Sequence, residues 1–507
     1  GNALFFPFRR QYICLKHVII SMKVKYACFI ISIFCLLFSC SDDDFTTSSS
    51  VSPLHFSTDT VDMDTVFANV PTSTRTFWVY NRSGVNVRLS SVRLAGGNQQ
   101  GYRVNVDGTY LSAESGFQTN NLEVRKNDSM RVFVELTSPK ATSEGLELIE
   151  DKLVFSQLGG MEQRVLLRAR SWKARSVKNL RIRRDTTLTG ETPIIVYGKI
   201  QVDSAATLTL APGTMLFFHD KAGIDVYGRL LVKGTAEANV VLRGDRLDKM
   251  FSYLPYDRVS GQWQGIHFNT SSYDNEIEFA DIHSTYNGIV CDSSSVDRST
   301  LSLRRSTIHN CQGYGLLATN CKIDVSNSQI TNTLKDCAAF FGGNITLSHC
   351  TLAQFYPFDG NRGAALRFGN SSDGKQYTLQ QFNVFNTLIT GYAEDVIMGA
   401  FSDEAAQNFK FDHSILRTIK PKELDAAKYV EVLWEEATDT VQSGEKHFRK
   451  IDGDKQAYDF HLSEKSKARD IGVALPNGIS TTDHDGFARD EKPDVGCYEY
   501  RPEKKKD

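Results

Sequence analysis

The feature that most constrains the fold is a repeat between residues 277 and 417, in which residue character recurs at fixed offsets although residue identity does not. Each copy has an apolar anchor, a small residue two positions before it and another apolar residue five positions before it. The copies are mostly 22 to 27 residues long. The anchors are Ile282, Ile308, Ile330, Leu352, Ile389 and Leu416, and the small residues are Ala280, Ser306, Ser328, Cys350, Thr387 and Ser414.

Short alternating runs at a period in the twenties indicate strands stacked in coils. One such unit cannot bury its apolar side chains, but it can do so by lying on the next unit, with strands paired in parallel about 4.8 Å apart. The small residues then fit a tight interior corner. A leucine-rich repeat would need regular Leu and Asn positions, which are missing. The sequence therefore predicts an all-β chain containing a single-stranded, right-handed parallel β-helix.

Composition and charge exclude some classes of protein. The chain is 41% hydrophobic and 23% charged, with a formal net charge of −2, so it has no electrostatic footprint for nucleic acid. None of its 10 cysteines forms a CxxC pair, which argues against a zinc site. The cysteines of the repeats either stack inward as free thiols or, for Cys311 and Cys321, form a bridge in an oxidising compartment.

The N-terminal segment carries a targeting pattern. Basic Met22-Lys23-Val24-Lys25 precedes an apolar run too short to span a membrane, which ends in Leu37-Phe38-Ser39-Cys40. This resembles a bacterial lipoprotein signal peptide. The resemblance implies that residues 1–39 are upstream sequence and signal peptide, with a natural start at Met22. It also implies that Cys40 carries the lipid that anchors the protein in the outer membrane.

Residues 40–55 combine this cysteine with an acidic tag and a linker. Ser41-Asp42-Asp43-Asp44 resembles the export tag that sends some lipoproteins to the outer face of the outer membrane, although a solvated tether has the same composition. The following Ser- and Thr-rich stretch is typical of a flexible linker. We therefore expect a lipid-anchored protein that faces the cell exterior.

Two segments precede the main repeats. Residues 56–172 contain longer alternating strands separated by turn clusters, which predicts an immunoglobulin-like β-sandwich without a Cys-Trp-Cys pin. Residues 173–193 are basic, but Trp172 is the only stacking aromatic residue near them, so a solvated connector is favoured over a nucleic-acid arm.

Further motifs extend the helix over residues 194–500. They are Ala211-Pro212-Gly213-Thr214, the stretch Gly261-Gln262-Trp263-Gln264-Gly265-Ile266-His267-Phe268, and the closing segments Asp470-Ile471-Gly472, Asp485-Gly486-Phe487-Ala488-Arg489 and Pro493-Asp494-Val495-Gly496-Cys497-Tyr498-Glu499-Tyr500. In this order they resemble right-handed β-helix domains of bacterial surface proteins. The resemblance implies fold rather than activity. We expect the closing segments to cap the last coil and residues 501–507 to form a charged tail.

A loop at residues 244–260 interrupts the coils and supplies the candidate ligand-binding residues. Aromatic rings stack on sugar faces, and charged groups take hydroxyls and carboxylates. If the loop instead packs over a coil, its charges pair with one another. The candidates, including one residue just after the loop, are Asp248, Tyr253, Tyr256, Asp257, Arg258 and Trp263.

Catalytic and metal signals are weak. The repeats carry neither the paired acids of polysaccharide hydrolases nor the stacked acids of calcium-dependent lyases. His283 and His309 share an offset on successive coils, with Asp281 and Asn310 nearby. They could share a metal or a proton, but no third ligand repeats, so exposed surface histidines are expected. No catalytic residue, cofactor or metal is predicted.

Three hypotheses for function remain. The favoured one is a non-catalytic surface lipoprotein that binds a glycan or a partner protein through a flank of the β-helix. The second is a polysaccharide lyase or glycoside hydrolase with a divergent site, and the third is a structural or adhesive spacer. A groove with stacked acids would favour the enzyme, exposed Tyr and Trp the binding protein, and a featureless polar flank the spacer.

Overall fold

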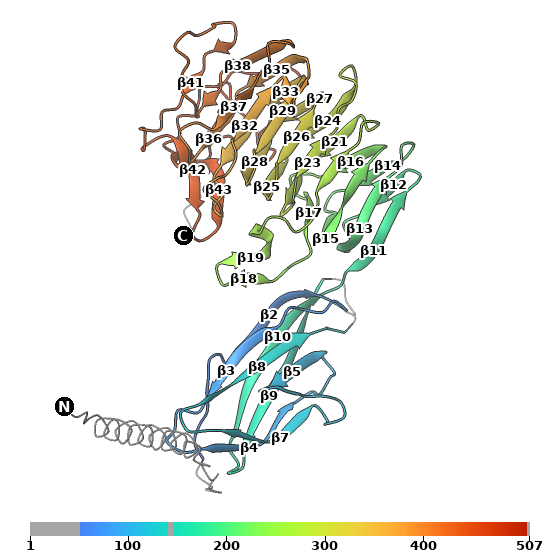
Figure 1. Ribbon diagram of the computed structural model, residues 1–507, viewed down its shortest axis with the longest axis vertical. Coiled ribbons are helices and arrows are strands. Elements are labelled where there is room, and N and C mark those ends of the chain that lie inside the picture. The colour runs from blue at the N-terminus through green and yellow to red at the C-terminus, as the bar shows by residue number, and fades with distance from the viewer. Residues whose placement is uncertain (1–50, 140–144, 504–507) are drawn as a thin grey trace, which may run out of the picture.

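The computed structural model describes residues 51–139 and 145–503, so Cys40 and the acidic tag lie outside the described residues. The described chain is built from strands and two short 3-10 helices, and it forms two bodies (Figure 1). We call residues 51–172 the sandwich domain and residues 175–503 the coil domain. Within the described ranges, no helix has the length and apolar character needed to cross a membrane.

The sandwich domain consists of two five-stranded sheets that share one apolar core. Alternate residues of β5 (Tyr102–Val106) are buried in this core, which is the pattern of a strand with one buried face. The first sheet contains β1 (His55–Phe56), β3 (Arg75–Tyr80), β8 (Ser129–Leu136), β5 (Tyr102–Val106) and β6 (Thr109–Tyr110). The second contains β2 (Thr60–Phe67), β10 (Glu162–Trp172), β9 (Leu146–Gln157), β4 (Val87–Leu94) and β7 (Gln118–Val124).

The coil domain is built from three parallel ladders, and each turn of the chain contributes one strand to each ladder in the middle of the stack. Long strands begin ladders 1 and 2 together: β11 (Arg175–Ile182), β13 (Ile194–Val202) and β15 (Met215–Val226). Ladder 1 continues through β17 (Val240–Gly244), β22 (Ala280–His283), β25 (Thr307–Cys311), β28 (Gln329–Thr333), β31 (Thr351–Gln354), β36 (Leu388–Gly391), β39 (Ile415–Leu416) and β41 (Leu433–Trp434).

The other two ladders complete each turn. Ladder 2 continues through β20 (Ile266–Phe268), β23 (Ile289–Cys291), β26 (Leu316–Thr319), β29 (Ala338–Phe341), β32 (Leu366–Gly369) and β37 (Ile397–Ala400). Ladder 3 contains β12 (Thr186–Leu188), β14 (Thr207–Leu210), β16 (Arg229–Lys233), β21 (Asn275–Glu278), β24 (Ser299–Arg304), β27 (Lys322–Ser326), β30 (Gly343–Ser348), β35 (Leu379–Phe385), β38 (Gln407–Asp412) and β40 (Tyr429–Val430).

The predicted anchors are vertical neighbours in one core. Ile308 pairs with Ile282 on one side and with Ile330 on the other, and all three are buried. The pairing continues through Leu352, Ile389 and Leu416. Large parallel sheets stacked turn on turn are consistent with a parallel β-helix, so the repeat predicted the register of the core.

The corner between ladders 3 and 1 has a regular backbone conformation and hydrogen-bond pattern that the sequence did not predict. The residue before each small residue has a left-handed backbone, for example Arg305 at φ 45° and Asn327 at φ 48°. The hydroxyl of Ser306 accepts from the backbone N–H of Ala280, at 3.1 Å, and the hydroxyl of Ser328 accepts from that of Ser306, at 3.2 Å. The column is therefore a hydrogen-bond ladder as well as a steric requirement.

The coil domain differs from expectation at both of its ends. Residues 173–193 are not a solvated connector, because β11 and β12 in this segment already pair with β13 and β14. The closing segment does not cap the last coil. It lies along the outer face of ladder 1, where Val495, Cys497 and Tyr498 share a second apolar cluster with ladder residues.

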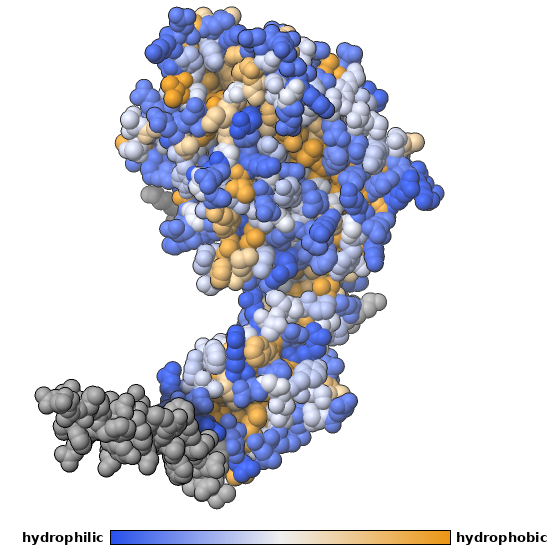
Figure 2. Space-filling view, viewed as in Figure 1, coloured by the Kyte–Doolittle hydropathy of each residue, from blue (hydrophilic) through white to orange (hydrophobic). Residues whose placement is uncertain are grey.

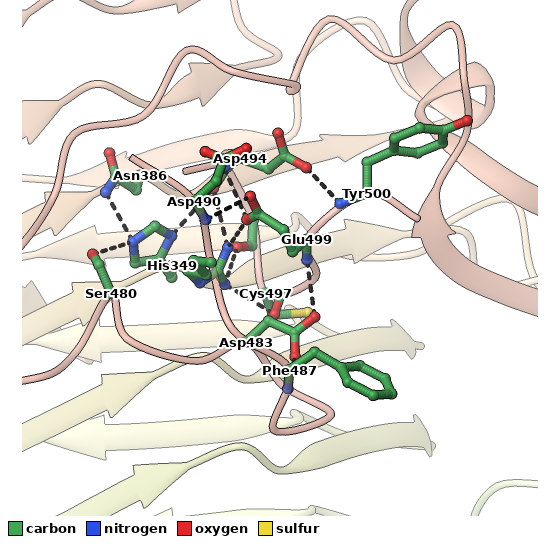
Figure 3. A network of polar contacts seen from close by, with 12 residues as sticks. His349, Asn386, Ser480, Asp483, Phe487, Asp490, Asp494, Cys497, Glu499 and Tyr500 are labelled. Atoms are coloured by element: carbon green, nitrogen blue, oxygen red, sulfur yellow. Dashed lines mark hydrogen bonds and ion pairs between the residues drawn. The ribbon is translucent and has the colours of Figure 1, made fainter. Parts of the chain in front are cut away.

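Buried polar contacts hold the closing segment in place (Figure 3). The buried Arg489 guanidinium donates to Glu499, at 3.0 Å, and to the side chain of Asn327, at 2.8 Å. His349 and Asn386 of the ladder corner also contact this segment. These bonds satisfy groups that the last part of the chain would otherwise bury unpaired.

Of the two alternatives for the cysteines of the repeats, the structure shows free thiols and no disulfide. The cysteines of the described residues are all buried and unbridged, so Cys311 and Cys321 form no disulfide. Burial raises the pKa of the Cys311 thiol to about 12, which keeps it protonated and unreactive.

Candidate functional site: a polar groove beside paired histidines

A groove lies where the outer face of ladder 1 is left uncovered, between the inserted loop and the hairpin formed by β42 (Phe448–Asp452) and β43 (Ala457–Leu462). Its volume is 380 Å³, which is within the usual range for small-ligand sites. The lining residues are Arg258, Thr307, His309, Asn310, Gln329, Thr331, Asn332, Tyr458, Asp459, Phe460, His461 and Tyr498.

The hairpin side of the groove is built around a protonated histidine paired with two carboxylates. His461 lies between two carboxylates, with Nδ1 2.5 Å from Asp459 and Nε2 2.8 Å from Asp485. Burial opposes protonation, but the hydrogen bonds to both carboxylates prevail and raise the pKa of His461 to about 9. Burial also opposes the charge of Asp485, yet His461 and His484 hold its pKa well below its ordinary value. At neutral pH this is an imidazolium between two carboxylates.

The ladder side of the groove carries an unsatisfied polar atom. Asn332 is 1% exposed, and its Oδ1 has no hydrogen-bond partner among the described residues. Asn332 itself has φ 55°, a left-handed backbone conformation that asparagine tolerates better than most residues. A buried carbonyl oxygen without a donor costs about 1–3 kcal/mol, so a ligand that donates to it gains affinity.

Arg258 forms the third side. It belongs to the 3-10 helix η1 (Tyr256–Arg258), and its guanidinium makes no ion pair in the described part of the chain. Its backbone carbonyl accepts from Asn310 Nδ2 at 2.6 Å, which ties the loop to ladder 1. Arg258 is therefore the cationic group of the groove without an ion pair among the described residues, whereas Asp459 and Asp485 offset the charge of His461.

The two candidate histidines differ from expectation in exposure. His283 and His309 do point away from the coil core, and their stacked rings are 4.6 Å apart. They are not surface residues, however, because they are 6% and 8% exposed beneath the inserted loop and the closing segment. The third group is Asp281, whose Oδ1 lies 2.9 Å from His283 Nδ1 and 3.1 Å from His309 Nε2.

The inserted loop packs over the coils instead of projecting from them. Asp248 pairs with Arg246 at 2.7 Å and accepts from Ser73 of the sandwich domain at 2.8 Å. Tyr256 lies under the Arg246 guanidinium. Asp257 faces Arg243 at 3.8 Å. The loop therefore packs over the coils, as the alternative interpretation of the sequence expected. Its charges, however, pair mainly with other parts of the chain: Asp245 with His219, Asp257 with Arg243 and Lys249 with Asp64.

The remaining candidates, Trp263 and Tyr253, both lie outside the groove. Trp263 is fully buried, stacked on Phe218 at 4.0 Å, and donates to the His283 carbonyl, so it cannot contact a sugar. Tyr253 is 53% exposed and stacks on Phe251 in the hairpin of β18 (Lys249–Phe251) and β19 (Leu254–Pro255), away from the groove. In Figure 2 this hairpin is a hydrophobic patch on an otherwise mixed surface.

Of the predicted residues, the structure brings Arg258 and His309 into the groove. The sequence reasoning missed Tyr458, His461 and Tyr498. The last lies in the recognised closing motif, but the motif gave no indication of which ladder face it covers. Alternation over 457–462 was the only signal for the β43 residues.

Comparisons with known proteins do not identify a family. No family model matches this chain, and no curated protein matches it. Among solved structures, an ASH/PapD-like domain of human CEP192 is similar at 13% identity, covering 27% of this chain and 96% of that one, with a TM-score of 0.17.

Two carbohydrate-active enzymes also have similar structures. The Yersinia enterocolitica family 28 exopolygalacturonase has 9% identity and covers 74% of this chain and 88% of its own, with a TM-score of 0.17. A family 123 glycoside hydrolase from Clostridium perfringens has 7% identity and covers 27% and 30%, with a TM-score of 0.18. These scores carry no argument about function.

Proposed function

We propose that this protein is a non-catalytic, lipid-anchored protein of the cell surface that binds an acidic glycan in the groove. In this proposal the coil domain is a right-handed parallel β-helix. The sandwich domain is an immunoglobulin-like spacer between it and the outer membrane. Cys40 carries the lipid.

The observation that carries the proposal is the set of groups in the groove. Arg258 makes no ion pair in the described chain, so its guanidinium can bind a carboxylate by charge-assisted hydrogen bonds. His461 is protonated at neutral pH, but Asp459 and Asp485 already accept from both of its ring nitrogens. Tyr458 adds ring surface, and Asn332 Oδ1 lacks a donor that a hydroxyl would supply. Carboxylate, hydroxyls and a flat apolar face together are the chemistry of a uronate or a similar acidic sugar.

Binding is better supported than glycoside hydrolysis. Hydrolysis needs two carboxyl groups on either side of the scissile bond. Asp459 is the one carboxylate among the lining residues of the described groove, and it is engaged with His461. Both ring nitrogens of His461 are also occupied, by Asp459 and Asp485. A histidine held in this way does not exchange protons with a ligand.

The experiment screens the purified protein against acidic and neutral polysaccharides, measuring both retention and the release of reducing or unsaturated ends. We expect retention of an acidic polymer without release of ends. Arg258→Gln removes one charge-assisted bond and should weaken binding about tenfold, since ~1.4 kcal/mol is a factor of ten. The matched control is Arg298→Gln, which alters an arginine that is 61% exposed and paired with Asp274.

Equal affinity of Arg258→Gln and the wild type would reject the groove as the site. Release of unsaturated or reducing ends would instead support the enzyme hypothesis. The anchor is tested separately in cells: Cys40→Ala should abolish incorporation of a labelled fatty acid and release the protein from the membrane fraction. Unchanged labelling would rule out Cys40 as the acylated residue.

A further inference from the structure

The cluster of Asp281, His283 and His309 holds a contact that requires either an additional proton or a cation. His283 and His309 are Cα partners on β22 and β25, so their rings stack, and Asp281 precedes His283 by two residues on the same face of the strand. One oxygen, Asp281 Oδ1, faces a nitrogen of each ring, at 2.9 and 3.1 Å.

The tautomer of His309 follows from its neighbours. The Arg258 carbonyl can only accept, so Asn310 must turn its Nδ2 toward it, at 2.6 Å. Asn310 Oδ1 then faces His309 Nδ1 at 2.6 Å and accepts its proton. In a neutral imidazole this leaves a lone pair on Nε2. That lone pair faces the Asp281 carboxylate, and a proton or a cation must lie between them.

The side chains around the cluster carry both signs of charge. Asp257 adds a second carboxylate, with a buried oxygen that has no hydrogen-bond partner among the described residues. Arg243 faces Asp257 at 3.8 Å, and Arg258 is a second guanidinium on the groove beside His309. The positions of the three donor atoms, and not a net charge, therefore favour an ion.

We propose that Asp281, His283 and His309 form a binding site for a divalent first-row transition metal, with Asp281 Oδ1, His283 Nδ1 and His309 Nε2 as ligands. Two imidazole nitrogens and one carboxylate oxygen are the donor set that such ions prefer. The three atoms lie within 4.8 Å of one another. Metal–ligand distances of about 2.0–2.2 Å place neighbouring ligands roughly 3.0–3.5 Å apart, close to the two oxygen–nitrogen distances above.

Asn310 has a defined role in this site. By accepting the Nδ1 proton, it directs the His309 Nε2 lone pair toward the ion, as partners of metal-bound histidines commonly do. Asn310 is itself held by the η1 backbone, so the inserted loop that covers the histidines also fixes the tautomer that a ligand needs. This gives the loop a function that does not depend on glycan binding.

The test uses the full coil and sandwich domains, stripped with a chelator and titrated with zinc chloride alone. Calorimetry and elemental analysis after desalting should give one tightly held ion per chain. His309→Asn should weaken the affinity about tenfold or more, and Asn310→Ala, which keeps all three ligands, should do the same. His413→Asn is the matched control, because the His413 side chain pairs with the neighbouring Asp412 and belongs to no candidate metal cluster in the described part of the chain.

Two results would overturn the proposal. One is wild-type zinc affinity no higher than that of both variants. The other comes from nitrogen-15 spectra of the wild type labelled at histidine, a measurement that needs no variant to fold. If these spectra show His309 protonated on both nitrogens, with no change on addition of zinc, then a proton lies between His309 Nε2 and Asp281. A zinc-dependent shift of the His283 and His309 resonances supports the site.

Discussion

At the scale of single residues, His461 links the groove to pH. Its pKa of about 9 in the folded chain lies above the ordinary value of 6.5. A group whose pKa is raised on folding stabilises fully below its unfolded pKa, and this stabilisation is lost as the pH rises through the folded pKa. The contribution of His461 is therefore present at pH 6 and declines toward pH 10.

We predict that wild-type protein exceeds His461→Gln in unfolding free energy by about 1–3 kcal/mol at pH 6, after allowance for solvent screening. The gap should narrow steadily between pH 7 and pH 10, because the wild-type imidazolium loses its charge while glutamine does not titrate. Urea denaturation of both proteins at each pH measures this. A gap that widens with pH would contradict the charge assigned to His461.

Only some of the residues that line the groove could be predicted from the sequence. Arg258 and His309 were found because one lies in an interrupted coil and the other in a repeated column. His461 was not found, because β43 follows the last repeat. No repeated offset therefore indicates which way its side chains point. Trp263 was assigned to binding although it is buried, because a single aromatic residue in a strand pattern does not reveal which face it takes.

At the scale of elements, the corner between ladders 3 and 1 does most to fix the path of the chain. Each hydroxyl in the column accepts a backbone N–H from the preceding turn and donates to a carbonyl two residues before it, as Ser328 Oγ does to Ser326 at 2.9 Å. Period and residue size predicted a small column. The hydrogen bonds could not be predicted from one sequence, because alanine and cysteine occupy the same offset in other turns.

We predict that Ser328→Ala destabilises the coil domain by about 1–2 kcal/mol, because it leaves the buried Ser306 N–H without its acceptor. Ser302→Ala, on the outer face of neighbouring β24, should change the unfolding free energy by less than about 0.5 kcal/mol. Chemical denaturation with a common m-value checks both. Equal effects of the two changes would mean that the column is steric only.

For other elements, the hydrophobic pattern alone was not enough to predict the structure. The spacing between the anchors Leu352 and Ile389 is longer than that of the other turns, and the small hairpin of β33 (Ser371–Ser372) and β34 (Lys375–Gln376) lies within it. The first turn of the coil domain was not predicted, because the exposed charged side chains of β11 are also typical of a solvated connector. A terminal turn has a neighbour on one side only, so its pattern is weaker.

At the scale of the whole molecule, the two domains meet through an aromatic cluster. Phe67 of the sandwich domain contacts Phe217 of the coil domain at 4.9 Å, and Trp172 contacts Phe217 at 5.9 Å. Asp248 of the inserted loop adds the hydrogen bond to Ser73. The loop therefore touches the sandwich domain, ladder 1 and the groove, which links the proposed spacer to the proposed binding site.

The groove exists only if the turns of the chain lie on one another, so the stacking of the coils is the claim on which the account rests. Ser302, Asp324 and Thr346 are Cα partners on successive turns of ladder 3 and face outward. Adjacent turns are about 4.8 Å apart and alternate turns about 9.6 Å apart. A disulfide needs Cα atoms within roughly 7 Å of each other.

The most direct measurement is therefore cross-linking of paired cysteines, read by mass spectrometry after mild oxidation. Ser302→Cys with Asp324→Cys should form a disulfide in the native protein but not in urea at the same dilution. Ser302→Cys with Thr346→Cys should form none under native conditions. A cross-link in the second pair, or none in the first, would contradict the stacked coils and the site built on them.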